Sequence, residues 1–308
     1  MSSENPLSQT RSPNIDPTGI KKKRGSRQSI SEIVWTVISG LCVVVALIPL
    51  ILVIVYVLIK GINRLDVAAF TELPPPPLSD EGGGFANALV GTLVMVFIGA
   101  LISVPFGVLA AIYLSEFSKG RIAKWIRFAT NVLSGVPSIL IGVFIYGLLV
   151  LTNVTGYSAI AGGTALAVLM LPIIVRTTDE SLQIVPQQVR WASVGLGASR
   201  YATVLRVVLP AALPAIATGL TLAVARAAGE TAPLIFTALF AQYWSFNPSN
   251  PLASLFNPTA SLSVLVYNFA AVPYDNQQEL AWAGSLILVA IVLLTSVISR
   301  WATRKRIY

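Results

Sequence analysis

Two ionisable residues, Arg226 and Glu230, interrupt the otherwise apolar stretch 212–240. A charge at the centre of a membrane span costs about 2.5 to 3.5 kcal/mol on insertion scales, so such residues usually have a function. At positions i and i+4 of one helix, the two side chains share a face and can reach each other. A guanidinium group can bind an oxyanion bidentately. The alternative is a local ion pair that lowers the insertion cost and fixes helix packing.

Most other kinds of catalytic chemistry lack the necessary residues. The sequence has no histidine and a single cysteine, Cys42. It therefore has no Ser-His-Asp or Cys-His system, no HExxH metal site and no intrachain disulfide. Neither a GxxxxGK[ST] phosphate loop nor a GxGxxG turn opening a helix occurs. We expect no catalytic residues, no metal and no cofactor.

The composition indicates a membrane protein. Of the 308 residues, 55% are hydrophobic and only 11% are charged, whereas soluble domains have roughly 25% charged residues. A span needs about 20 apolar residues to cross the hydrocarbon layer. Six segments meet this requirement, at 34–60, 88–114, 129–152, 159–175, 212–240 and 280–299.

The distribution of positive charge predicts the orientation. Of the 21 Lys and Arg residues, only Lys60 and Arg64 fall on one side of the six spans, and Arg226 falls within a span. The others flank the opposite side, which the positive-inside rule assigns to the cytoplasm. Both termini are therefore expected in the cytoplasm. The net charge of +8 then follows from topology, and we expect no nucleic-acid partner.

The segments between the spans have distinct compositions. Residues 1–33 predict a disordered basic cytoplasmic tail, and 300–308 a second, short cytoplasmic tail. The external loop 61–86 contains the stiff run Pro74 to Pro77. The external segment 241–279 predicts a partly buried or re-entrant cap, because Trp244, Phe246, Phe256 and Tyr267 lie among its prolines and asparagines.

The cytoplasmic segment 176–210 is expected to form two short helices with a bend at Gly195 and Gly197, or else an ordinary loop on the membrane surface. Its sequence resembles the membrane subunits of binding-protein-dependent ABC importers. Their pattern is Glu-Ala-Ala, three residues, Gly, nine residues, Ile, one residue, Leu-Pro. This chain keeps every spacing, with Trp191, Ala192, Ser193, Gly197 and Leu209-Pro210, although Trp191 replaces the glutamate and Ser193 the second alanine.

Other segments narrow the resemblance to the PstA-type permeases of phosphate importers. They are Gly135-Val136-Pro137-Ser138, Leu171-Pro172 followed by Arg176 to Glu180, and Arg226 to Pro233. The resemblance covers about residues 82–299. It implies an all-α integral membrane protein with six transmembrane helices, the type I ABC importer permease fold, and a permease core at 87–299.

The resemblance also implies function and partners. The chain would be a non-enzymatic permease subunit of an ATP-driven phosphate importer in the bacterial inner membrane. It would work with a PstC-type sister permease, PstB-type ATPase subunits that hydrolyse ATP, and a PstS-type extracytoplasmic phosphate-binding protein. Loop 176–210 would couple to the ATPase through Trp191, Ala192, Ser193, Gly197, Tyr201 and Pro210. Arg226 and Glu230 would lie on the substrate path.

Several alternatives stand beside this interpretation. Tyr201 is either a knob for a groove on the ATPase or an interfacial aromatic residue, and Arg200 and Arg206 either contact the ATPase or retain the loop inside. The substrate could be another oxyanion, such as sulfate or molybdate. A secondary transporter would need repeated halves and further intramembrane acids. A scaffold or sensor subunit would not need Arg226 in the membrane.

Overall fold

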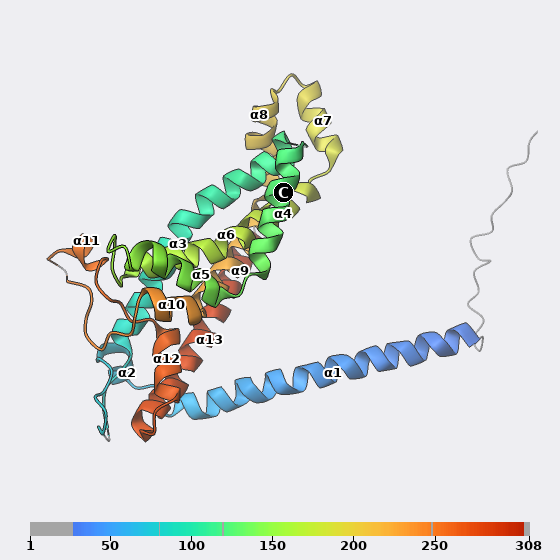
Figure 1. Ribbon diagram of the computed structural model, residues 1–308. Helices are drawn as coiled ribbons and strands as arrows, with labels where there is room; N and C mark the ends of the chain where they lie inside the picture. Colours follow the sequence, from blue (N-terminus) through green and yellow to red (C-terminus); the bar gives the residue numbers. More distant parts are fainter. Residues whose placement is uncertain (1–26, 80, 119, 248, 305–308) are drawn as a thin grey trace, which may run out of the picture. The chain divides into compact units, whose positions relative to one another are not determined.

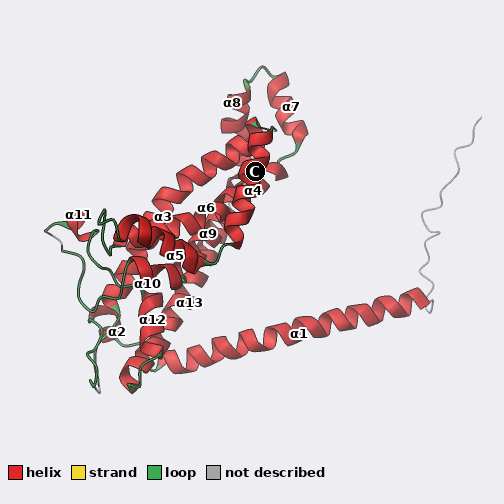
Figure 2. Ribbon diagram, in the orientation of Figure 1, coloured by secondary structure: helices red, strands yellow, loops and turns green. Residues whose placement is uncertain are grey.

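The computed structural model describes residues 27–304, except for 80, 119 and 248. Every regular element in this described part is a helix (Figure 2). Five helices are long and apolar enough to cross a membrane, and the number is six if a bent pair counts as one span. The predicted all-α fold with several spans is confirmed. Most of the predicted tail, residues 1–26, lies outside the described residues.

The chain divides into two compact units, residues 1–55 and 56–308. Helix α1 crosses this division and begins at Arg27, ahead of the predicted start of the first span at Val34. The helices are α1 (Arg27–Ile62), α2 (Val67–Thr71), α3 (Ala86–Ile112), η1 (Tyr113–Phe117), α4 (Arg121–Gly135), α5 (Ser138–Ile145), η2 (Tyr146–Val150), α6 (Ala159–Ile184), α7 (Gln187–Gly195), α8 (Arg200–Thr203), η3 (Val204–Val208), α9 (Leu209–Ala228), α10 (Ala232–Thr237), α11 (Pro251–Ser254), α12 (Leu262–Ala270) and α13 (Asp275–Arg304).

Helices α3, α6 and α9 supply most of the main core. Met95 of α3, Met170 of α6 and Ala223 of α9 are fully buried in one cluster. Small residues bring α3 and α6 close together, since a Cβ added to Gly107 would lie 2.7 Å from Ile174 Cγ2. Close packing of this kind holds helices together where lipid gives no hydrophobic drive for association.

The predicted span 129–152 is not one straight helix. Helix α4 already begins at Arg121, and the axis turns by 101° between α4 and the segment Ser138–Val150. The turn occurs at Val136, which has extended backbone angles and precedes Pro137. Proline disfavours the helical conformation in the residue before it, so the sequence Val136-Pro137 explains the break.

The predicted span 212–240 is also interrupted. Helix α9 ends at Ala228, with Gly229 as its C-terminal cap, and the short helix α10 begins at Ala232. Pro233 lies in the first turn of α10, a position where its missing N–H does no harm. Gly229 and Pro233 together account for the two helices, and Glu230 lies in the break between them.

The segment 241–279 is partly buried, as predicted, but through other residues than the predicted aromatic ones. Helix α12 buries Leu262, Leu265 and Phe269 completely or almost completely. Trp244 and Tyr267 are exposed. The segment is thus partly buried, but two leucines and a phenylalanine of α12 anchor it instead of the four predicted aromatic residues.

Helix α6 continues to Ile184, beyond the predicted end of its span at 175. Two short helices follow, α7 and α8, which lie side by side in Figure 1. Gly197 lies between them with φ +86°, a backbone angle that glycine adopts without steric cost. We call residues 187–203 the α7–α8 hairpin. It matches the predicted pair of short helices, except that Gly195, which was expected at the bend, is the last residue of α7.

Candidate functional site

Arg226 and Glu230 form an ion pair across the break after α9. The Arg226 Nε atom lies 3.4 Å from Glu230 Oε1, and the side chains are 53% and 16% exposed. The backbone carbonyl of Glu230 accepts a hydrogen bond of 2.8 Å from Ser263 Oγ of the buried α12 segment. The carboxylate thus belongs to an anchored residue, while the guanidinium group at the end of α9 remains accessible.

The predicted geometry of this pair was partly wrong. It assumed a continuous helix with both side chains on one face, whereas Glu230 lies outside α9. The side chains still meet because the backbone N–H of Glu230 bonds to the carbonyl of Ala227. This bond forms a turn after α9 that keeps Glu230 close to Arg226. A discontinuous helix with polar side chains at its break is a common construction for binding sites inside membrane transporters.

Five of the six predicted coupling residues lie on the α7–α8 hairpin. Trp191 and Ala192 are exposed on α7. Ser193 Oγ lies 2.9 Å from Thr203 Oγ1 of α8, so the residue that replaces the pattern's second alanine links the two helices. Gly197 forms the turn.

Tyr201 and Pro210 complete the predicted set. The ring of Tyr201 is stacked on Phe117 with centroids 4.9 Å apart, although the Tyr201 side chain is still 69% exposed. Pro210 is not in the hairpin but in the first turn of α9. Arg226 lies in the last turn of the same helix, so α9 connects the two groups of predicted residues.

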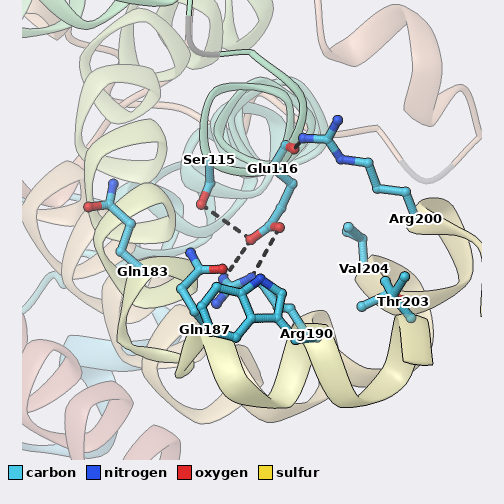
Figure 3. Close-up of a pocket in the computed structure, with 10 residues that line it drawn as sticks. Ser115, Glu116, Gln183, Gln187, Arg190, Arg200, Thr203 and Val204 are labelled. Carbon is cyan, nitrogen blue, oxygen red and sulfur yellow. Dashed lines mark hydrogen bonds and ion pairs between the residues drawn. The ribbon is translucent and has the colours of Figure 1, made fainter. Parts of the chain in front are cut away.

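A buried carboxylate that was not predicted from the sequence lies beside the hairpin. Glu116 of η1 accepts two bonds from Arg190 of α7, from Nη2 to Oε1 at 2.7 Å and from Nε to Oε2 at 3.3 Å. Figure 3 shows the two side chains facing each other in a cavity of about 560 Å³. The cavity is lined by Ser115, Glu116, Gln183, Gln187, Arg190, Trp191, Val194, Arg200, Thr203 and Val204.

A second missed pair lies beside the first. Arg127 of α4 binds Asp179 of α6 bidentately, with Nε to Oδ2 at 2.9 Å and Nη2 to Oδ1 at 3.1 Å. Its Nη2 also donates to the carbonyl of Leu114, at 3.0 Å. Bidentate pairs of this kind are strong and directional. One signal for this pair was present in the sequence. Asp179 is an acidic residue soon after the apolar segment 159–175, on the side where most flanking charges are positive.

The chain has relatives among known transport proteins. It is similar to the phosphate transport system permease protein PstA of Xylella fastidiosa, with 40% identity over 78% of this chain and 81% of that protein. The protein of the same name from Haemophilus influenzae is 40% identical over 85% of this chain and 90% of its own length.

Solved structures share the fold. A bacterial alginate ABC transporter has a TM-score of 0.60 at 14% identity, covering 89% of this chain and 96% of that chain. An inward facing conformation of the MetNI methionine ABC transporter has a TM-score of 0.54 at 20% identity, covering 73% and 95%. The profile of the binding-protein-dependent transport system inner membrane component matches residues 103–308. This match covers well over half of the chain, which therefore belongs to the family of binding-protein-dependent transport system inner membrane components.

Proposed function

We propose that the chain is the permease subunit of an ATP-driven importer of inorganic phosphate, located in the bacterial plasma membrane. Support comes from relatives named phosphate transport permeases, which match at 40% identity over most of the chain. The observation that carries the proposal is the accessible guanidinium group of Arg226 at a helix break. It provides a planar cationic fork for an oxyanion in a segment that is otherwise apolar.

Arg226 and Glu230 have complementary roles in this proposal. Arg226 binds phosphate oxygens as the anion passes, because its paired N–H groups match two oxygens of one phosphate. Glu230 neutralises the guanidinium group between transport events and accepts a hydrogen bond from a protonated phosphate oxygen. The long separation of 3.4 Å suits an ion pair that an incoming anion can replace.

The α7–α8 hairpin would transmit ATP hydrolysis to the transport path. Trp191 and Tyr201 are exposed aromatic side chains, and such residues often dominate docking surfaces. Trp191, Ala192 and Tyr201 would contact the ATPase directly, Ser193 and Gly197 would maintain the hairpin, and Pro210 would join it to α9. The partners would be a PstC-type sister permease, PstB-type ATPase subunits and a PstS-type phosphate-binding protein.

Uptake of radiolabelled phosphate by cells carrying the Arg226→Lys variant tests the substrate role. Lysine keeps the charge but cannot reproduce the bidentate fork, so we expect a loss of about tenfold or more at unchanged protein abundance, equivalent to about 1.4 kcal/mol. Normal uptake by a well-expressed variant would reject Arg226 as a phosphate ligand. Competition by sulfate or molybdate against the wild-type protein distinguishes a phosphate importer from one for another oxyanion.

Orientation is tested separately by reporter fusions. We propose that both termini and the α7–α8 hairpin lie in the cytoplasm, while 61–86 and 241–279 lie outside, because almost all Lys and Arg residues flank one side. Fusions after Glu180 and Tyr308 should report a cytoplasmic location, and one at Asn250 an external location. A cytoplasmic signal at Asn250 would contradict the proposed topology.

A further inference from the structure

The π-helical turn η1 is the place where both helices of the α7–α8 hairpin meet the end of α3. It follows α3 without interruption and ends at Phe117. Two of its residues, Glu116 and Phe117, contact α7 and α8. Single π-helical turns are frequent at functional sites, and this one ends the helix beside the hairpin.

Arg190 connects α7 to two other helices, and Glu116 is its carboxylate partner. Its carboxylate receives both bonds from the Arg190 guanidinium group, and the side chains are only 8% and 12% exposed. Arg190 also donates to the carbonyl of Leu182, at 2.8 Å, and to the carbonyl of Val185. These carbonyls belong to the last turn of α6 and the residue that follows it. One buried cation therefore ties α7 to the ends of both α3 and α6.

Helix α8 is attached to the same turn through different contacts. Arg200 donates a hydrogen bond to the backbone carbonyl of Glu116. The Arg200 guanidinium group also lies 5.3 Å from the centre of the Phe117 ring. The Phe117 ring is also stacked against the ring of Tyr201. Both helices of the hairpin are thus fixed to η1, and any displacement of the hairpin must act on α3.

The α7–α8 hairpin has no acidic residue of its own to pair with Arg190. The importer pattern has a glutamate where this chain has Trp191, so α7 contains no acidic residue to accompany Arg190. Glu116 supplies that negative charge from a helix 74 residues away in sequence. We propose that Glu116 is a positioning residue that couples movement of the α7–α8 hairpin to α3, and this inference depends on the proposed function as an ATP-driven importer.

A purely structural ion pair makes a different prediction. Removing one partner of a buried pair leaves an unpaired charge and destabilises the protein, whereas removing both largely restores stability. A positioning role is lost in both cases, because the connection between α7 and α3 is gone. The number of phosphate ions imported per ATP hydrolysed therefore separates the two roles, since stability alone does not change this ratio.

The experiment uses the complete importer, reconstituted in liposomes with its ATPase and binding protein. For Glu116→Gln we expect the ratio of phosphate imported to ATP hydrolysed to fall about fivefold or more, which is the low end of coupling between distant sites. Glu116→Gln combined with Arg190→Gln should regain thermal stability but keep the low ratio. Because it contains no unpaired buried charge, this double variant also provides the test if the single variant folds poorly.

Arg64→Gln is the matched control, because Arg64, with a side chain that is 13% exposed, also binds a carboxylate and carbonyls. These partners are Asp66, Gly82 and Gly83, none of which belongs to the hairpin. It should lose stability without a change in the ratio. An unchanged ratio in Glu116→Gln, or recovery of the ratio in the double variant, would overturn the positioning role while leaving phosphate import by the wild-type complex intact. Failure of the wild-type complex to import phosphate would instead reject the proposed function and this inference with it.

Discussion

Arg190 lies 2.7 Å from Glu116 with both side chains nearly buried, whereas Arg226 lies 3.4 Å from Glu230 and is 53% exposed. Removing one partner of a buried pair costs about 3 to 5 kcal/mol, while an exposed pair contributes about 0 to 1 kcal/mol. The same two residue types therefore serve different purposes. The buried pair fixes three helix ends, and the exposed pair leaves an arginine available to a ligand.

The backbone reinforces this contrast. Arg190 bonds to carbonyls at the end of α6 as well as to Glu116, so its guanidinium group is held by several acceptors. Arg226 lies in the last turn of α9, directly before the break at Gly229 and Glu230. Helix ends at such breaks expose polar groups that a continuous helix would satisfy internally. The break therefore fits the proposed anion site, and the bonds at η1 fit the proposed coupling role of the hairpin.

The strongest test of the contrast replaces Arg226 and Glu230 together by methionine. No unpaired charge remains, so replacing both partners by apolar residues should not destabilise the protein. Phosphate uptake should nevertheless fall to background, because no cationic fork is left for the anion. Uptake and protein abundance are measured in the same cells. Normal uptake by an abundant double variant would show that the pair is only structural.

A smaller effect is expected at the turn of the α7–α8 hairpin. Gly197 has φ +86°, and forcing an L-residue into this region costs about 1 to 2 kcal/mol. Gly197→Val should therefore lower uptake per ATP hydrolysed by about thirtyfold at most, while membrane insertion stays normal. Gly195→Val is the matched control, because an added Cβ meets nothing within 4 Å at either glycine, and of the two only Gly197 has a positive φ. Equal behaviour of the two variants would contradict a role for the turn geometry.

The smallest effect is expected for Ser193→Ala. This change restores the alanine of the importer pattern but removes the link of 2.9 Å to Thr203. A single hydrogen bond contributes about 0.5 to 1.5 kcal/mol, and the ion pair and ring contacts at η1 would still hold both helices. We expect a slightly lower thermal midpoint and uptake within about twofold of the wild-type value. A complete loss of uptake would mean that Ser193, rather than η1, fixes the hairpin.

The sequence was sufficient for features that depend on local composition. Apolar segments longer than about 17 residues identified the candidate spans, and the spacing from Trp191 to Pro210 identified the hairpin. The breaks at Val136-Pro137 and at Gly229 to Pro233 were harder to predict. Proline and glycine are also tolerated within membrane helices, so their presence does not by itself separate a kink from the end of a helix.

The ion pairs at the hairpin could not be obtained from the sequence. Glu116 and Arg190 are 74 residues apart, and Arg127 and Asp179 are 52 apart. No periodicity connects such positions, because the partner of a charged side chain depends on which helices pack together. Arg226 and Glu230, by contrast, are close in sequence and were paired correctly even though the expected continuous helix was wrong.

The sequence by itself determined that the chain crosses a membrane, which side holds most of its positive charge, and which short segment resembles an ATPase-coupling loop. Only the tertiary structure decided which arginine is buried against a carboxylate and which is accessible. Burial and pairing result from the packing of α3 against α6, which brings η1 and the end of α6 together around Arg190 of α7. Because a buried charge needs a partner and an exposed one does not, that packing separates Arg190, which Glu116 holds, from Arg226, which remains accessible.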